Sequence, residues 1–135
     1  MKISFNVPSL PPKKDGANSM WRKGSEFSRL KSLRIAAFLA MEGSSPLTGE
    51  ISLVLKLYTS PDRGDLDNFI TGICDGLMAA HPRTPIDLTL WEDVPEKVKP
   101  QYAICYVDDK QITRISAQRF SPSKGEEGYT IELEW

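Results

Sequence analysis

The sequence predicts a single domain that combines β-strands with two helices. Its 135 residues suffice for one domain with a buried core, and a content of 40% hydrophobic and 26% charged residues argues against a disordered chain. Apolar and polar residues alternate in several short segments, as in half-buried strands. Two longer segments instead repeat apolar residues every three to four positions, which is typical of helices.

Five segments are expected to form strands. Residues 2–7 and 50–59 alternate apolar and polar side chains, and residues 129–135 give the clearest alternation in the chain. Residues 112–120 also alternate and form an extended stretch. Residues 103–107 are a short apolar run, which we interpret as a buried strand.

The first helix is predicted over residues 25–41, with Ser25 as its N-cap. Apolar residues keep helical spacing along this segment. Arg29, Lys31 and Arg34 make its first half basic, and such a run is most often a solvated face.

The second helix is predicted over residues 66–77, with one apolar face that we expect to be buried. After it the periodicity ends. Residues 79–101 contain four prolines and are interpreted as a loop insertion, with one helical turn near residues 91–98.

Two aspartates, Asp65 and Asp67, stand where a turn gives way to the second helix. Asp67, Thr71 and Asp75 follow at four-residue steps and therefore share one helix face. Hard cations such as Mg²⁺ bind carboxylate oxygens and keep several waters, so neighbouring aspartates at a rigid helix start suit them. The alternative is local: Asp65 caps the helix, and Asp67 meets the positive end of its dipole.

A second acidic pair, Asp108–Asp109, follows the apolar run at residues 103–107. Two such pairs favour a shared metal site over an isolated helix cap. A structural ion site of the EF-hand kind is disfavoured, because Phe69 stands where an oxygen ligand is needed.

Positive charge gathers in the first part of the chain. The first 63 residues hold ten Lys or Arg and five Asp or Glu, whereas the rest hold seven and thirteen. Residues 13–24 interleave four cations with one aromatic residue and can neutralise phosphates and stack on a base. The equal alternative is a solvated loop with Trp21 packed on the core. The candidate DNA-binding residues are Lys13, Lys14, Trp21, Arg22, Lys23 and Arg29.

Several functional classes are disfavoured. The chain has no apolar segment of membrane-spanning length and no signal-peptide pattern, so we expect a cytoplasmic protein without a membrane partner. It has no P-loop or dinucleotide fingerprint, so no nucleotide cofactor is expected. The single histidine, His81, lacks the neighbours that a zinc site or a catalytic triad needs. Cys74 and Cys105 lie in apolar contexts, which favours buried reduced thiols.

Three separated pieces of the chain resemble motifs of one known family. In chain order they are Gly64-Asp65-Leu66-Asp67-Asn68, then Asp75-Gly76-Leu77, then Val107-Asp108-Asp109-Lys110-Gln111-Ile112. Together with Pro11-Pro12 ahead of the basic loop, they resemble the RusA family of Holliday junction resolvases, and the similarity spans most of the chain.

The resemblance implies an α+β fold in which residues 1–135 form a single domain, with a mixed β-sheet packed with two main helices. It also implies a homodimeric, Mg²⁺-dependent endonuclease that resolves four-way DNA junctions in recombination and repair, with Mn²⁺ as the alternative cation. Asp65, Asp67 and Asp109 match the catalytic, metal-binding aspartates, and Asp108 stands beside the third. Asn68 and Asp75 match further motif positions.

Two departures from the family pattern matter. Thr71 stands where the family usually has a lysine, and the segment between Leu77 and Val107 is longer than in typical members. Lys110 or Arg63 can supply the missing charge from another direction. The alternative function is therefore a non-catalytic or weakly active protein of the same fold that binds branched DNA.

Overall fold

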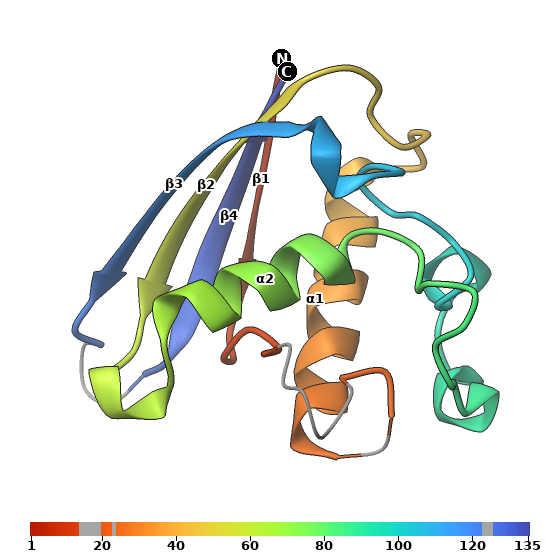
Figure 1. Ribbon diagram of the computed structural model, residues 1–135, viewed down its shortest axis with the longest axis horizontal. Helices are drawn as coiled ribbons and strands as arrows, with labels where there is room; N and C mark the ends of the chain where they lie inside the picture. The colour runs from red at the N-terminus through yellow and green to blue at the C-terminus, as the bar shows by residue number, and fades with distance from the viewer. Residues whose placement is uncertain (14–19, 23, 123–125) are drawn as a thin grey trace.

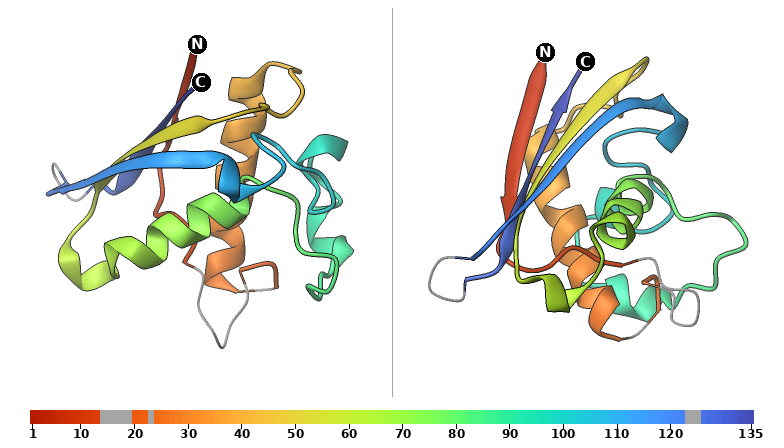
Figure 2. Two further views of the ribbon diagram at one scale, coloured as in Figure 1. Left: turned by 45° about the horizontal axis from the view of Figure 1, so that its top comes forward. Right: turned by 60° about the vertical axis from the view of Figure 1, so that its left-hand side comes forward.

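One four-stranded sheet with both α-helices on the same side makes up the architecture (Figures 1 and 2). The computed structural model describes residues 1–13, 20–22, 24–122 and 126–135. The strands are β1 (Lys2–Val7), β2 (Ile51–Tyr58), β3 (Ile112–Phe120) and β4 (Gly128–Glu134), and the helices are α1 (Ser25–Met41) and α2 (Leu66–Gly76).

The sheet is mixed, which confirms the predicted α+β class. The strand order is β1-β4-β2-β3, so the last strand in sequence lies between the first two. β4 is antiparallel to both β1 and β2, whereas β2 and β3 run parallel. The parallel pair requires a crossover connection, and α2 is part of it.

The core lies between the sheet and the two helices. Leu53, Leu55 and Leu57 alternate with more exposed residues along β2 and point to the helix side. They belong to the same buried cluster as Leu33 of α1 and Ile73 of α2. The opposite face of the sheet carries no helix in the described part of the chain (Figure 2). Within the described residues, no helix has the length and apolarity needed to cross a bilayer.

The predicted strand at residues 103–107 is wrong. Ile104, Cys105 and Tyr106 are buried as expected, but only an isolated bridge joins Tyr106 to Leu47. The N–H groups of Ile104 and Cys105 both donate to the carbonyl of Leu77, at 3.2 and 3.1 Å. The run is apolar because it packs against the end of α2. A short apolar run in a sequence shows that the segment is buried, but it does not show whether its backbone pairs with a strand or with another part of the chain.

The insertion at residues 79–101 contains two 3-10 helices, η2 (Leu88–Trp91) and η3 (Glu96–Val98), in place of the predicted single turn. Trp91 and Val98 are buried and, with Met20, Trp21 and Leu30, form a second apolar cluster. The insertion is therefore anchored to α1. A smaller correction concerns Ser25, which is the first residue of α1; the N-cap position belongs to Gly24, without a side-chain cap bond.

Arg34 of α1 is fully buried, so it does not belong to a solvated basic face. Its guanidinium donates to the carbonyls of Val98 and Lys99 in the insertion and of Tyr102 just after it, at 2.9, 2.9 and 2.6 Å. It also donates to those of Gly76 and Met78 at the end of α2, both at 2.7 Å. Burial lowers the pKa of Arg34 to about 9, so the side chain remains charged at neutral pH. One side chain thus ties the insertion, α1 and α2 together.

We expect Arg34→Met to lower the free energy of unfolding by about 3–5 kcal/mol, because buried carbonyls lose their donors. Urea unfolding followed by circular dichroism measures the change. Arg114→Met is the matched control: Arg114 is exposed on β3, so its loss should change stability by about 0.5 kcal/mol or less. Equal urea midpoints for the two variants would contradict the anchoring role.

Candidate functional site

Asp65 and Asp67 lie exposed at the start of α2. The 3-10 turn η1 (Pro61–Arg63) delivers the chain to Asp65, which occupies the N-cap position in extended geometry but makes no side-chain cap bond. One Asp67 oxygen accepts the adjacent N–H group of Asn68, at 3.0 Å. Asp65 therefore occupies the N-cap position of the local alternative, with Asp67 in the first turn, but it does not form the capping hydrogen bond which that alternative requires.

Arg119 fixes the turn that precedes these carboxylates. From the helix side of β3 its Nη2 donates to the carbonyl of Gly64 at 2.5 Å. Arg63, which we predicted as a supporting cation, forms an ion pair with Glu127 at 3.5 Å. Glu127 also accepts the hydroxyl of Thr59. The sequence analysis missed Arg119, because strand alternation alone does not show that an edge-strand arginine reaches a neighbouring turn.

Asp109 lies beside the other end of α2. Its N–H group donates to the sulfur of Met78 at 3.1 Å. Burial raises the pKa of the Cys74 thiol to about 11, and the nearby negative charges of Asp109 and then Asp75 add to the rise. The Tyr106 hydroxyl donates to the carbonyl of Cys74 at 2.6 Å, and mainly burial raises its pKa well above the usual range. Asp75 and Asp109 therefore both lie near the Cys74 thiol, at this end of α2.

The predicted convergence of Asp65, Asp67 and Asp109 on one ion is not seen. Asp67 and Asp75 share a face, but eight residues of helix separate them by about 12 Å along the axis. Within the described residues, no group of three or more His, Cys, Asp or Glu side chains is placed to hold a metal ion. The acidic residues instead form two sets, one at each end of α2.

Asp108 has a local structural role, and its predicted role as a metal ligand stays a prediction. It is the N-cap of the 3-10 helix η4 (Asp109–Gln111), and its side chain accepts the N–H group of Lys110 at 2.9 Å. Gln111 closes the capping box and donates to the carbonyl of Leu47 at 2.8 Å. Lys110 is exposed in this turn, near the Asp109 end of α2.

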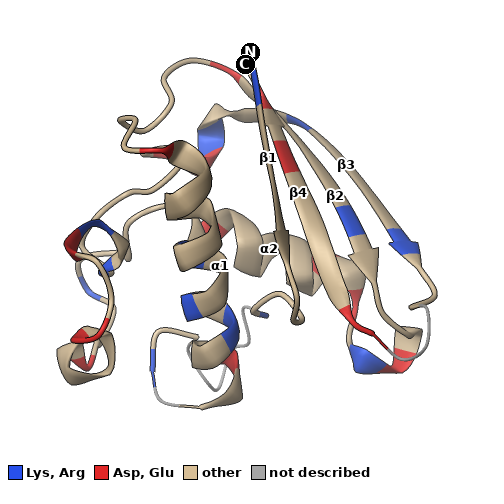
Figure 3. Ribbon diagram, turned by 180° about the vertical axis from the view of Figure 1, so that it is seen from behind, with Lys and Arg blue, Asp and Glu red and all other residues tan. Residues whose placement is uncertain are grey.

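The predicted DNA-binding residues fall in different environments. Trp21 is only 7% exposed and packs against Trp91, with ring centroids 6.4 Å apart, so the core-packing alternative holds. Arg22 is exposed, whereas Arg29 pairs with Glu26 at 3.0 Å. The Lys and Arg residues of α1 occupy the half nearer its start (Figure 3). Lys14 and Lys23 lie outside the described residues.

No protein-family model matches the chain. A search of curated proteins finds no significant match either. The chemistry of the residues around α2 is therefore the basis for any assignment.

We expect Asp109→Asn to lower the pKa of Cys74, because a negative charge beside a thiol disfavours the thiolate and its removal relieves that effect. Thiolate absorbance during alkaline titration measures the midpoint, in a Cys105→Ala background that leaves Cys74 as the only cysteine. Asp93→Asn is the control, since Asp93 pairs with Lys31. An unchanged midpoint in Asp109→Asn would place Asp109 away from α2.

Proposed function

We propose that this chain is a Mg²⁺-dependent, structure-selective DNA endonuclease of the RusA type, which hydrolyses phosphodiester bonds in four-way junctions. The observation that carries the proposal is the polar side of α2. Exposed Asp65 and Asp67 stand at its start and Asp75 and Asp109 lie at its far end, while the segment that carries Lys13 crosses the helix at buried Gly72.

Burial of the apolar face of α2 does not explain the acidic residues on its other side. Asp67 and Asp75 share a helix face with Thr71, and burial of the opposite face does not require any of them. Grouped carboxylates repel one another and are a common way to attract a divalent cation. This arrangement favours metal-assisted phosphate chemistry over a purely structural role.

Positive charge beside α2 supports a phosphate substrate. Lys13 contacts the helix directly, through the ring of Phe69. The start of a helix also favours negative charge through its dipole. Cations that contact the DNA backbone bind junctions without reading their bases, which fits recognition by shape.

The residues fit a magnesium ion only in part. The described residues offer no preformed three-ligand cage. Mg²⁺ is, however, commonly held by one or two carboxylates together with substrate phosphates and waters, and Asp65 and Asp67 would serve in that way. Such an ion supplies an activated water and stabilises charge on the phosphate. Mn²⁺ is the alternative cation.

We also propose that the protein acts as a homodimer in the cytoplasm. Resolution of a four-way junction needs two symmetric incisions, which two copies related by a two-fold axis supply. The described cysteines, Cys74 and Cys105, are both buried and unpaired, as expected in a reducing compartment.

A non-catalytic junction-binding protein is the second candidate. The absence of a preformed metal cage among the described residues favours it. So does Thr71, whose hydroxyl donates to the carbonyl of Asp67 at 3.0 Å and offers no charge. A protein of this kind would bind branched DNA equally well with Mg²⁺ or with a chelator.

We expect Asp67→Asn to reduce Mg²⁺-dependent cleavage of a synthetic four-way junction by on the order of 100-fold or more, because it weakens metal binding. Asp65→Asn should act in the same direction, whereas Asp109→Asn tests whether the acidic set at the other end of α2 takes part in cleavage. Junction affinity in chelator and the melting temperature should stay close to those of the wild type, since these side chains are exposed. A gel assay of labelled junctions measures both cleavage and binding.

Asp62→Asn is the matched control for these variants. Asp62 is an exposed aspartate in the turn just before Asp65 and lies outside the proposed ligand set. Wild-type protein that binds junctions but never cleaves them would favour the non-catalytic candidate. Full activity in Asp109→Asn would remove that residue from the site.

A further inference from the structure

We infer that Lys13 supplies the cation that acts on the scissile phosphate beside Asp65 and Asp67. This inference rests on the proposed endonuclease function. It assigns to Lys13 the role of a catalytic residue reaching the site from the segment before α1, rather than that of one phosphate contact among several on a basic loop.

The backbone of Lys13 is held against α2 at one point. A Cβ atom added to Gly72 would lie 1.9 Å from the carbonyl oxygen of Pro12 and 3.3 Å from the Cα atom of Lys13. Only glycine therefore permits this approach, and the segment crosses the helix in direct contact with its backbone.

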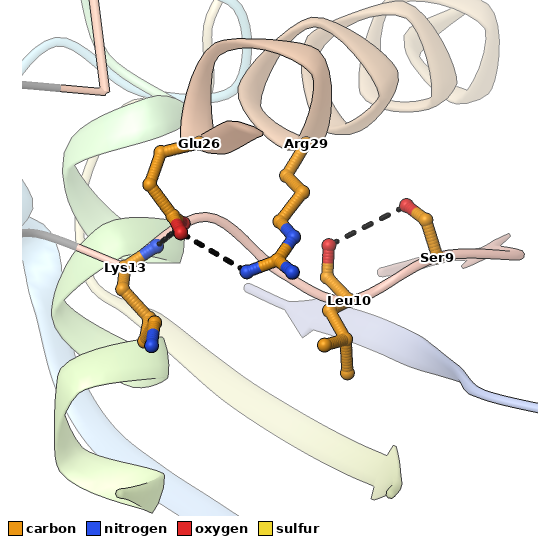
Figure 4. A network of polar contacts seen from close by, with 5 residues as sticks. All are labelled: Ser9, Leu10, Lys13, Glu26 and Arg29. Carbon is orange, nitrogen blue, oxygen red and sulfur yellow. Dashed lines mark hydrogen bonds and ion pairs between the residues drawn. The ribbon is translucent and has the colours of Figure 1, made fainter. Parts of the chain in front are cut away.

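Glu26 fixes the same residue from the side of α1. One Glu26 oxygen accepts the backbone N–H group of Lys13 at 2.7 Å, and the other accepts Nη1 of Arg29 at 3.0 Å. Figure 4 shows Glu26 reaching from the first turn of α1 to this backbone, while the Lys13 side chain points away from Glu26. The main chain of Lys13 is thus held between the two helices.

The side chain of Lys13 extends toward the start of α2. Its Cδ atom lies 3.1 Å from the position of a Cβ atom on Gly64, the residue immediately before Asp65. Its ammonium nitrogen lies 5.9 Å from the ring centroid of Phe69, in the first turn of the helix. Because Gly64 has no side chain, the aliphatic stem of Lys13 lies against it and carries the charge to this end of α2.

The other cations considered for this role have different partners or positions. Arg63 pairs with Glu127, and Arg119 donates to the carbonyl of Gly64. Lys110 belongs to η4, whose first residue contacts Met78 beyond the far end of α2. Among the described Lys and Arg residues named for this site, Lys13 is the one whose side chain lies along the first turn of α2.

The chemistry gives this ammonium a specific task. Hydrolysis of a phosphodiester adds a water oxygen to phosphorus and breaks the bond to the leaving sugar oxygen, so negative charge grows on the phosphoryl oxygens in the transition state. A fixed ammonium stabilises that charge most when it grows, so its loss lowers the cleavage rate more than the affinity.

The test compares Lys13→Met and Lys13→Arg in single-turnover cleavage of a four-way junction at saturating Mg²⁺. Methionine keeps an unbranched stem against Gly64 and removes the charge, whereas arginine keeps the charge. We expect a loss on the order of 100-fold for Lys13→Met, with junction affinity in chelator changed only a few-fold. Lys13→Arg should retain most of the rate. Lys56→Met is the matched control, because Lys56 is exposed on β2.

Wild-type cleavage against Asp67→Asn is measured first, so that the two proposals fail separately. If the wild type cleaves and Lys13→Met is equally fast, the assignment of Lys13 is overturned while the proposed function stands. The same holds if Lys13→Arg is as slow as Lys13→Met, because fit rather than charge then matters. A folded wild type without metal-dependent cleavage overturns both.

Discussion

The buried guanidinium of Arg34 is the interaction on which the arrangement around α2 depends. A charge in an apolar interior is tolerated only when its donors are satisfied, and here five backbone carbonyls accept from one side chain. Two of these carbonyls belong to Gly76 and Met78, at the end of α2. The same side chain faces Trp21 at 5.3 Å from the ring centroid. The long insertion therefore helps to stabilise the core, because its carbonyls hold the buried Arg34.

From that anchor, α2 is positioned by contacts at both of its ends. Arg119 holds the turn before it, and Arg34 holds the turn after it. The segment at Pro12 crosses its middle at Gly72. A helix restrained at three points holds its exposed carboxylates in fixed positions. Functional sites in general require side chains that are held in place in this way.

The fold could be predicted from periodicity, and the contacts could not. Alternation along β2 indicates a strand, and helical spacing along α1 and α2 indicates helices, because each pattern reflects one buried face. Residues 103–107 show where sequence patterns stop being informative. Their apolar composition indicates burial, but it does not reveal that their hydrogen-bond partner is Leu77, which is distant in sequence. Arg34 is a second residue whose environment could not be predicted from the sequence. A cation among other cations on a helix resembles a solvated face, and only the packing of the insertion shows that it is enclosed.

The place of β4 in the sheet has a consequence for how the chain reaches this structure. β4 is synthesised after the other described strands, yet it is the only described strand that β1 pairs with, and it also borders β2. Until it arrives, β1 has no neighbour, and β2 lacks one of its two. Its register joins Lys2 to Glu134, so closing the sheet depends on contacts of very long range. Folding of such a topology is slow relative to a helical bundle of similar size, and helices form before the sheet that they cover.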